Sequence, residues 1–471
     1  MIGALAAERP AGGALWLVGG AVRDALLGGA PRELDLAAPS GALELGRALA
    51  ARAGAAFVAL DEVRGVGRVI GPVRVDIADF RAPTLEGDLA ARDFTVNALA
   101  APLAALAASG RAPVTDPTGG LADLAAGRVR LCAPGALADD PVRILRAARL
   151  AVRPGWRLDD GVMPAARAAA PALAGVAAER VRDELARLLD GPAAGRGLRL
   201  LDALGALDVL LPESRAMRAT PQPLPHHFDV WEHSLRAVEA ADRLVAEAAR
   251  VSDWGGEVAA RFREDLGDGL TRAAMLRLAA LLHDVAKPET RAEVDDRVRF
   301  IGHDVAGAAR VAGIGERWRL SRRAVAVLER LVRHHLRPMH LALAGPITRR
   351  ARHRFFRDLG EDAPDLLLLA LADAAGLRGD DPLAVWAGEG GRVLRELMAG
   401  AAEERALAAA PPLVTGDDVM AAFALAPGRE VGRLLARARE AQALGLVATR
   451  EEALALLARG GPSLDTPEPA S

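Results

Sequence analysis

The chain has 471 residues, 51% of them hydrophobic and 26% charged, as in a globular protein with two or three domains. A formal net charge of −2 excludes a protein that is basic throughout, so any nucleic-acid site must be a local patch. No apolar run reaches the roughly 18 residues that span a bilayer, and the N-terminus around Glu8 and Arg9 lacks a signal-peptide pattern. The single cysteine, Cys132, excludes an internal disulfide framework and is typical of a cytoplasmic protein.

Strand and helix patterns alternate in the first third of the chain. Residues 15–18 form a short apolar run that ends at Gly19-Gly20, and residues 21–27 have the pattern of a helix. Residues 34–36 and 73–77 alternate between polar and apolar side chains, as strands do. This part of the chain therefore predicts an α/β domain.

Helical periodicity takes over from about Asp139, and proline- and glycine-containing breakers separate the helices. The α/β pattern ends near Ala125, a proline-rich link covers residues 220–225, and a further helical stretch begins near Pro382. We therefore expect an α/β head, a helical neck, a second helical domain and a helical C-terminal region with a disordered tail after Gly460. Their predicted ranges are 1–125, 126–219, 220–381 and 382–471.

The first candidate site combines a glycine turn with carboxylates. Gly19-Gly20 stands between a strand and a helix, where backbone N–H groups can approach a phosphate closely. Glu33 and Asp35 are two residues apart on an expected strand and so face the same side, and Asp76 on a neighbouring strand could add a third carboxylate. Phosphoryl transfer with two metal ions needs such a cluster. Taken alone, the same residues could form an ordinary turn and a solvated strand face.

Six segments in chain order make this interpretation specific. They are residues 18–36, 76–81, 92–98, 116–120, 140–143 and 179–181. Together they resemble the bacterial tRNA nucleotidyltransferase and poly(A) polymerase family, the class II CCA-adding enzymes. The resemblance implies a polymerase-β-like α/β nucleotidyltransferase head followed by an all-α neck. It also implies template-independent addition of nucleotides to the 3′ end of tRNA, with release of pyrophosphate.

The resemblance implies roles for individual residues. Glu33 and Asp35 would bind catalytic Mg²⁺ ions, and Asp76 would assist. The family usually has aspartate where Glu33 stands, and the extra methylene shifts the carboxylate. The residues expected to contact the triphosphate, ribose or base of the nucleotide are Gly19, Gly20, Arg23, Arg92, Asp93, Asn97, Asp140, Arg143, Arg146 and Arg149.

Asp140 and Arg143 resemble the pair that this family uses in place of a nucleic-acid template. A carboxylate accepts a hydrogen bond from the cytosine amino group, and a guanidinium donates to the ring acceptors. Three residues apart on one helix, the two side chains share a face, where they could equally form an ion pair. Arg143, Arg146, Arg149 and Arg153 recur at helical spacing and predict a basic stripe for RNA phosphates. For Arg149 and Arg153 a solvated arginine face is the alternative.

A short connection bears on the choice of nucleotide. Family members that add the terminal A have a flexible loop between the strand of the third carboxylate and the next conserved segment. Here Phe80-Arg81 is followed almost directly by residues 84–89. This resembles the CC-adding subset, so we expect addition of cytidines from CTP. Full CCA addition, which also uses ATP, and poly(A) synthesis are the alternatives.

The second candidate site is a series of histidines and aspartates on expected helices. The series is His233, His283, Asp284, His303, His334 or His335, and Asp373. It resembles the HD phosphohydrolase superfamily, whose members with extra histidines hold more than one metal. Histidine with carboxylate suits Ni²⁺, Mn²⁺, Fe²⁺ or Zn²⁺. Metal-bound water would attack a phosphoester, and Lys287 would contact the phosphate.

The remaining histidines are interpreted as ordinary core or surface residues; they are His226, His227, His340 and His353. Together the two sites predict a cytoplasmic enzyme that acts on tRNA with CTP, and with ATP if it completes CCA. No membrane association is expected, and no stable protein partner can be inferred. One alternative of another class is an HD hydrolase with an inactive, RNA-binding transferase head, which Glu33 alone favours.

Overall fold

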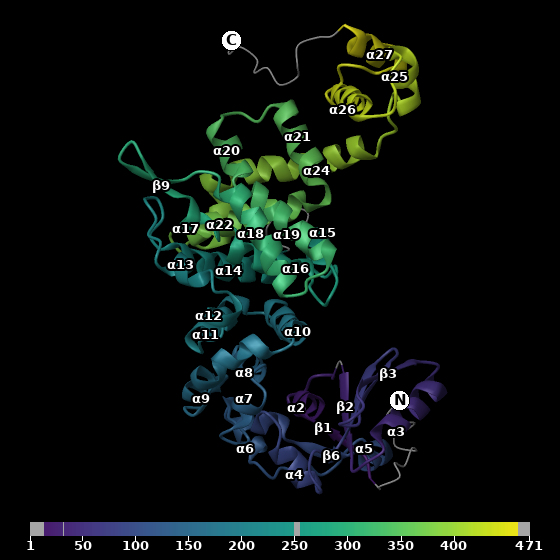
Figure 1. Cartoon of the computed structure of the whole chain (residues 1–471), viewed down its shortest axis with the longest axis vertical. Helices are drawn as coiled ribbons and strands as arrows, with labels where there is room; N and C mark the ends of the chain where they lie inside the picture. The colour runs from purple at the N-terminus through teal and green to yellow at the C-terminus, as the bar shows by residue number, and fades with distance from the viewer. Residues whose placement is uncertain (1–13, 32, 249–254, 460–471) are drawn as a thin grey trace. The chain divides into compact units, whose positions relative to one another are not determined.

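The computed structural model describes residues 14–31, 33–248 and 255–459, which divide into two compact units (Figure 1). The first unit extends to Arg215 and includes Arg317–Arg319, and the second comprises Ala216–Glu316 and the chain from Leu320 onward. The interpretations of the N-terminus around Glu8 and of the tail after Gly460 lie outside the described residues. Within the described ranges, no helix is both long enough and apolar enough to cross a membrane.

A six-stranded sheet organises the first unit, in the order β3-β4-β5-β2-β1-β6. The neighbours β2 and β5 run parallel, and the other neighbouring pairs are antiparallel. The three strands expected from the sequence are present. The strands are β1 (Trp16–Val18), β2 (Glu33–Ala38), β3 (Ala56–Asp61), β4 (Val66–Ile70), β5 (Arg74–Asp79) and β6 (Ala100–Pro102).

The alternation of side chains along β2 and β5 separates a hydrophobic face from a charged one. Leu34 and Leu36 of β2 and Val75 and Ile77 of β5 are buried in one hydrophobic core with residues of helix α3 (Ala42–Ala53). Because successive side chains of a strand point to opposite faces, the candidate carboxylates lie on the other side of the sheet. The hydrophobic pattern therefore determines which face carries the charged residues.

Helices follow the sheet, so the expected α/β head with a helical continuation is confirmed. The helices beside the strands are α2 (Gly20–Leu26), α3, α4 (Leu85–Ala90), α5 (Leu103–Ser109) and α6 (Gly120–Ala125). Two short parallel strands, β7 (Arg128–Val129) and β8 (Arg157–Leu158), lie among the helices that come later in the chain. These later helices are α7 (Ala136–Asp139), α8 (Arg143–Ala151), α9 (Val162–Ala169), α10 (Ala178–Leu189), α11 (Ala194–Ala203), α12 (Leu207–Leu210) and α13 (Ser214–Arg218).

The second unit is helical, with α14, α16 and α22 packed together at its centre. Its helices are α14 (Val230–Ala246), α15 (Gly255–Phe262), α16 (Arg272–Leu282), α17 (Lys287–Thr290), α18 (His303–Arg317), α19 (Arg322–His334), α20 (Arg337–Leu343), α21 (Arg349–Leu359), α22 (Ala363–Gly376), α23 (Pro382–Ala387), α24 (Arg392–Ala409), α25 (Gly416–Phe423), α26 (Arg429–Ala443) and α27 (Arg450–Ala458). The last three share a separate hydrophobic core.

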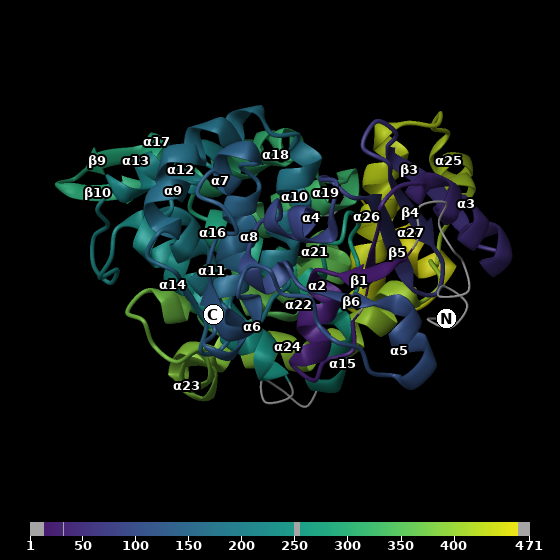
Figure 2. The same cartoon turned by 90° about the horizontal axis from the view of Figure 1, so that it is seen from below.

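One feature of this unit departs from the expected all-α fold. Strands β9 (Arg291–Val294) and β10 (Arg297–Phe300) form an antiparallel hairpin, which extends away from the helices of its unit in both views (Figures 1 and 2). The two connecting residues, Asp295 and Asp296, have φ values of 52° and 56°. Aspartate tolerates this left-handed conformation, which two-residue hairpin turns require.

Candidate active sites

The glycine turn and the first carboxylate converge as expected. Gly19 precedes α2 with a φ of 70°, a conformation that favours glycine. A Cβ atom placed on Gly19 would lie 3.3 Å from Asp35 Oδ2 and 3.3 Å from Arg92 Nη1. Asp35 therefore faces the turn, and the absence of a side chain at Gly19 keeps the space between Asp35 and Arg92 open.

The three candidate carboxylates differ in their partners. Asp35 stands opposite Asp76 in the register of β2 and β5, and burial together with the charge of Asp76 raises the pKa of Asp35. Asp76 accepts two hydrogen bonds from Arg68, at 2.7 and 2.8 Å. Glu33 forms an ion pair with Arg74, which is opposite it in the same register. Asp76 and Glu33 thus each have an arginine counter-charge, and a cation would relieve the remaining repulsion between Asp35 and Asp76.

A chain of hydrogen bonds connects α2 with helix α8. Arg23 donates to Asn97 Oδ1, and Asn97 Nδ2 donates to Asp93 Oδ1 at 3.1 Å. Arg146 Nη1 of α8 donates to the other oxygen, Asp93 Oδ2, at 2.8 Å. Burial alone would raise the pKa of Asp93, but Arg146 and these hydrogen bonds outweigh it and lower the pKa to about 2. Four of the expected nucleotide-binding residues therefore form one network.

The arginines of α8 are held by carboxylates. Arg146 and Arg149 both donate to Glu184 of α10, at 3.1 and 2.8 Å, and Arg153 donates to Asp24 at 2.9 Å. Glu184 is only 4% exposed, so its charge is compensated inside the protein. The side chains predicted as a basic stripe are therefore paired within the unit. Glu184, which sequence reasoning missed, is the residue that joins two of them.

Asp140 and Arg143 are close together, but they do not share one helix. Asp140 follows the last turn of α7 with an extended backbone, and α8 begins at Arg143. The reason is Pro141, because the residue before a proline is restricted to extended conformations. Arg143 Nε lies 3.9 Å from Asp140 Oδ2, which also accepts a hydrogen bond of 2.7 Å from Arg180. The expectation of one common helix was wrong, although the two side chains remain neighbours.

The link between β5 and α4 is as short as the sequence indicates. It consists of five residues, 80–84, between Asp79 and Leu85. Thr84 caps α4 by accepting a hydrogen bond from Gly87 N at 3.1 Å, and Arg81 N donates to Asp88 Oδ1 at 3.1 Å. The connection is therefore anchored at its C-terminal end as well as short.

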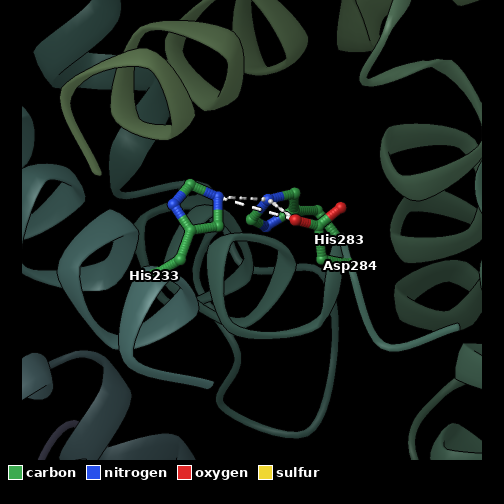
Figure 3. Close-up of side chains that lie close together, drawn as sticks. All are labelled: His233, His283 and Asp284. Carbon is green, nitrogen blue, oxygen red and sulfur yellow. Dashed lines mark hydrogen bonds and ion pairs between the residues drawn. The ribbon is translucent and has the colours of Figure 1, made fainter. Parts of the chain in front are cut away.

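The second unit brings the expected histidines together. His233 projects from α14, and His283 and Asp284 follow directly after α16 (Figure 3). The Nε2 atoms of His233 and His283 are 3.2 Å apart, and His283 Nε2 lies 3.1 Å from Asp284 Oδ2 (Figure 3). Asp373 Oδ1, from α22, lies 3.0 Å from His233 Nε2. His233, His283 and Asp284 form one group of candidate metal ligands, and Asp373 lies beside it.

A second group shares Asp284 with the first. His303 Nε2 lies 3.3 Å from Asp284 Oδ1 and 3.2 Å from His335 Nε2. His335 is 3% exposed, whereas His334 is half-buried and belongs to neither group. The geometry therefore selects His335 from the two adjacent histidines. These are the groups of three close metal-ligand side chains among the described residues.

Three histidines of the two ligand groups have the tautomer that metal ligation requires. The Nδ1 atoms of His283, His303 and His335 lie 2.9, 2.6 and 2.6 Å from backbone carbonyl oxygens. A carbonyl only accepts, so each Nδ1 carries the hydrogen and each Nε2 presents its lone pair to the centre. Neither carboxylate oxygen of the buried Asp284 accepts a hydrogen bond of ordinary geometry, although Lys287 Nζ forms an ion pair with Oδ2. Lone pairs that converge around such a carboxylate are what a divalent cation satisfies.

Family models match the chain in succession. The poly A polymerase head domain matches residues 15–130, the probable RNA and SrmB-binding site of polymerase A matches residues 155–217, and the HD domain matches residues 230–375. An A-adding tRNA nucleotidyltransferase of Deinococcus radiodurans is 40% identical over 451 residues, which cover 94% of this chain and 94% of that protein. The chain belongs to the tRNA nucleotidyltransferase and poly(A) polymerase family.

Two further comparisons agree with this family. A CC-adding tRNA nucleotidyltransferase of Thermus thermophilus is 37% identical over 377 residues, covering 77% of this chain and 76% of the relative. A solved structure of a Thermotoga maritima CCA-adding enzyme complexed with tRNA has a TM-score of 0.57 at 19% identity, covering 95% of this chain and 91% of that one. The latter likeness establishes a shared fold.

Sequence reasoning missed two residues at the HD centre of this family member, His226 and Gln222. His226, interpreted as an ordinary histidine, lies beside His233 with ring centroids 5.2 Å apart. Burial lowers the pKa of His226 to about 4, and the charge of Lys287 acts in the same direction. Lys287 Nζ lies 2.6 Å from Asp284 Oδ2 and donates to Gln222 Oε1 at 2.6 Å. The loop before α14 thus contributes side chains to the edge of the centre.

Proposed function

We propose that the first unit transfers nucleotides from nucleoside triphosphates to the 3′ end of tRNA. The RNA 3′ hydroxyl attacks the α-phosphorus, and pyrophosphate leaves. The observation that carries this proposal is the position of Asp35, between Asp76 and the glycine turn at Gly19. Asp35 and Asp76 would hold Mg²⁺, joined by Glu33 once its carboxylate leaves Arg74. Bound Mg²⁺ supplies positive charge that stabilises the negative charge on the attacking and leaving oxygens.

The remaining groups position the nucleotide in this proposal. Arg23 and Arg92, which flank the glycine turn, would contact the triphosphate, while Asp93 and Asn97 would contact the ribose. Asp140 would accept from the amino group of the incoming base. Such positioning accounts for much of the catalysis in phosphoryl transfer, because the protein itself forms no covalent intermediate.

Two reactions are candidates, addition of cytidine and addition of adenosine, and one observation favours each. The anchored five-residue link after β5 favours cytidine addition, which is our leading proposal. The relative that matches 94% of the chain is named A-adding, which favours adenosine addition to a tRNA that already ends in CC. A tRNA substrate and the single Cys132 support a cytoplasmic location for either reaction.

The experiment uses three tRNA preparations, ending before CCA, after C and after CC, each incubated with one labelled nucleoside triphosphate at a time. Cytidine addition predicts incorporation of CTP into the first two and none of ATP into the third. Incorporation of ATP into the CC-ending tRNA alone would establish the A-adding reaction instead. Unlimited ATP incorporation into any of the three would identify a poly(A) polymerase.

We propose a second activity, metal-dependent hydrolysis of phosphoesters, for the HD centre. The two ligand groups that share Asp284 support it, and the bound cation would be Ni²⁺, Mn²⁺, Fe²⁺ or Zn²⁺. Such a cation supplies a nucleophilic water at neutral pH. Lys287, held at the edge of the centre, would contact the phosphate. Full-length protein loaded with Mn²⁺ or Ni²⁺ should hydrolyse p-nitrophenyl phosphate or nucleotide phosphoesters, and Asp284→Ala should not; equal rates would reject the assignment.

A further inference from the structure

A cavity of about 870 Å³ lies within the second unit, and none of its lining residues belongs to the ligand groups of the HD centre. Helices α15, α21, α24 and α26, which are labelled in Figure 1, provide most of its wall. A cavity of this size accommodates a small organic molecule. Since neither reaction proposed above uses these residues, the cavity is a candidate site for a separate ligand.

The wall of the cavity is largely apolar. Val258 of α15, Phe356 of α21, Pro364 of α22 and Leu407 of α24 line it, together with alanines of α24 and α26. The small alanine side chains leave room beside the ring of Phe356. An aromatic side chain next to such space favours a flat aromatic ligand, which can stack on its face or meet its edge.

The charged side chains around the cavity already have partners. Each glutamate that lines it forms an ion pair with an arginine; these glutamates are Glu257, Glu264, Glu361, Glu404 and Glu440. The lining arginines are held by carboxylates or, in the case of Arg439, by the carbonyl oxygens of Ala408 and Ala410. A charged ligand would therefore find no free counter-charge among these lining residues, so an uncharged ligand fits the cavity better.

His353 of α21 is a lining residue with an unmet hydrogen bond. It is 8% exposed, and its Nδ1 atom lies 3.0 Å from Oε2 of the buried Glu404. A carboxylate only accepts, so Nδ1 carries the hydrogen. Arg352 Nε donates to the other oxygen of Glu404 at 3.2 Å and balances its charge without a second proton on the imidazole. Nε2 therefore presents a lone pair, and this buried atom has no hydrogen-bond partner among the described residues.

We propose that the cavity binds an uncharged, planar heteroaromatic molecule whose ring N–H donates a hydrogen bond to His353 Nε2. The apolar wall provides contact area for the ring, the paired charges disfavour a net charge on the ligand, and the lone pair of Nε2 requires a donor. His353 lies outside both metal-ligand groups, so this site is independent of the HD centre.

The test is calorimetric binding of three probes to the full chain at pH 8. They are benzimidazole, 1-methylbenzimidazole, which lacks the ring N–H, and benzimidazole-5-carboxylate, which carries a charge. Benzimidazole should bind one-to-one with a Kd of about 1 mM or tighter, which an efficient ligand of this size can reach. Each of the other two probes should bind at least about tenfold more weakly, because it lacks the hydrogen bond or brings an unpaired charge into the cavity.

Two variants locate the binding. His353→Asn keeps a donor for Glu404 near the Nδ1 position but has no group at the position of Nε2. It should bind benzimidazole about tenfold more weakly than wild type does, and 1-methylbenzimidazole equally well. His340→Asn is the matched control, since His340 is an exposed histidine of α20 outside the cavity, and it should behave as wild type. The melting temperature of each variant shows whether it is folded.

The opposite results would overturn the inference. They are a wild type that does not bind benzimidazole, equal affinities for benzimidazole and either of the other probes, or a folded His353→Asn variant with wild-type affinity. Displacement of benzimidazole by saturating CTP or ATP would place it in the first unit and would also overturn the inference. If His353→Asn does not fold, the affinities of the three probes for wild type, measured with and without CTP, decide the matter.

Discussion

Asp35 and Asp76 are directly opposite each other on the parallel strands β2 and β5. Burial and the charge of Asp76 raise the pKa of Asp35, so the ionised form of Asp35 opposes folding. For an acid whose folded pKa is raised, this cost grows as the pH rises from the unfolded pKa through the folded pKa. The two strands therefore hold two carboxylates next to each other, and the binding of a cation between them would stabilise their ionised forms.

Replacing Asp35 should reveal the free-energy cost of keeping its carboxylate ionised in the folded protein. Asp35→Asn should raise the melting temperature of the protein at pH 7 in the absence of divalent cations, because it removes a buried charge that faces Asp76. At a pH below 4 the difference between the variant and the wild type should shrink, since Asp35 is then protonated. Calorimetry with and without Mg²⁺ measures both effects. A variant that melts lower than wild type at pH 7 would contradict this electrostatic interpretation.

A methyl group at the glycine turn should impair nucleotide binding. Gly19→Ala places a Cβ atom 3.3 Å from both Asp35 and Arg92 and also strains a backbone with positive φ, so KM for the nucleoside triphosphate should rise about tenfold. Gly28→Ala is the matched control, since Gly28 has a φ of 80° with nothing within 4 Å of its Cβ position. Both variants should lose about 1 kcal/mol of stability. Equal kinetics for the two variants would show that the space at Gly19 is unimportant.

The pair Asp93–Arg146 should make the first unit sensitive to acid. The folded pKa of Asp93 is lowered to about 2, so its contribution is complete above the unfolded pKa near 3.8 and is lost as the pH falls toward 2. At neutral pH this contribution is on the order of 2 kcal/mol. The melting temperature of wild type should therefore fall between pH 5 and pH 2 more steeply than that of Asp93→Asn. Parallel pH profiles would mean that this pair does not stabilise the unit.

Adjacent histidines provide a matched test of the metal centre. His335→Ala should lose the metal of the second ligand group, because His335 Nε2 lies with His303 and Asp284. His334→Ala should keep it, since His334 is half-buried and outside both groups. Elemental analysis of each purified variant after loading with Mn²⁺ measures the difference. Equal metal content in both variants would contradict the ligand assignment.

The strand carboxylates were predictable because the period of a strand is short and strict. Once Leu34 and Leu36 are assigned to the core, Glu33 and Asp35 must share the opposite face. The counter-charges were not predictable in this way. The pairing of Glu33 with Arg74 depends on the parallel register of β2 with β5, which no local pattern specifies.

Other details had signals in the sequence that were not used. His335 is four residues after Leu331 and three after Val332, both buried, so the helical period places it on the inner side at the C-terminal end of α19. Glu184 likewise falls on the apolar face of α10, between Val181 and Leu185, where a charge requires a buried partner. A charged or ligating residue on an apolar face was the available clue.

His226 illustrates the opposite case. It lies in a proline-rich loop without periodicity, so no pattern indicates where its side chain points. Its place beside His233 arises from the long-range anchors of the loop, such as the hydrogen bond from Lys287 to Gln222. Loop residues at a metal centre therefore required the structure, whereas helix and strand residues largely did not.

The most direct measurement of the central claim is nucleotide incorporation into tRNA that lacks CCA, compared between wild type, Asp35→Ala and His335→Ala. If Asp35 holds the catalytic metal beside the glycine turn, Asp35→Ala should lose at least about a hundredfold in rate, as expected when several kcal/mol of metal stabilisation are removed. His335→Ala, altered in the other unit, should incorporate nucleotides at the wild-type rate. Unchanged incorporation by Asp35→Ala would contradict the claim.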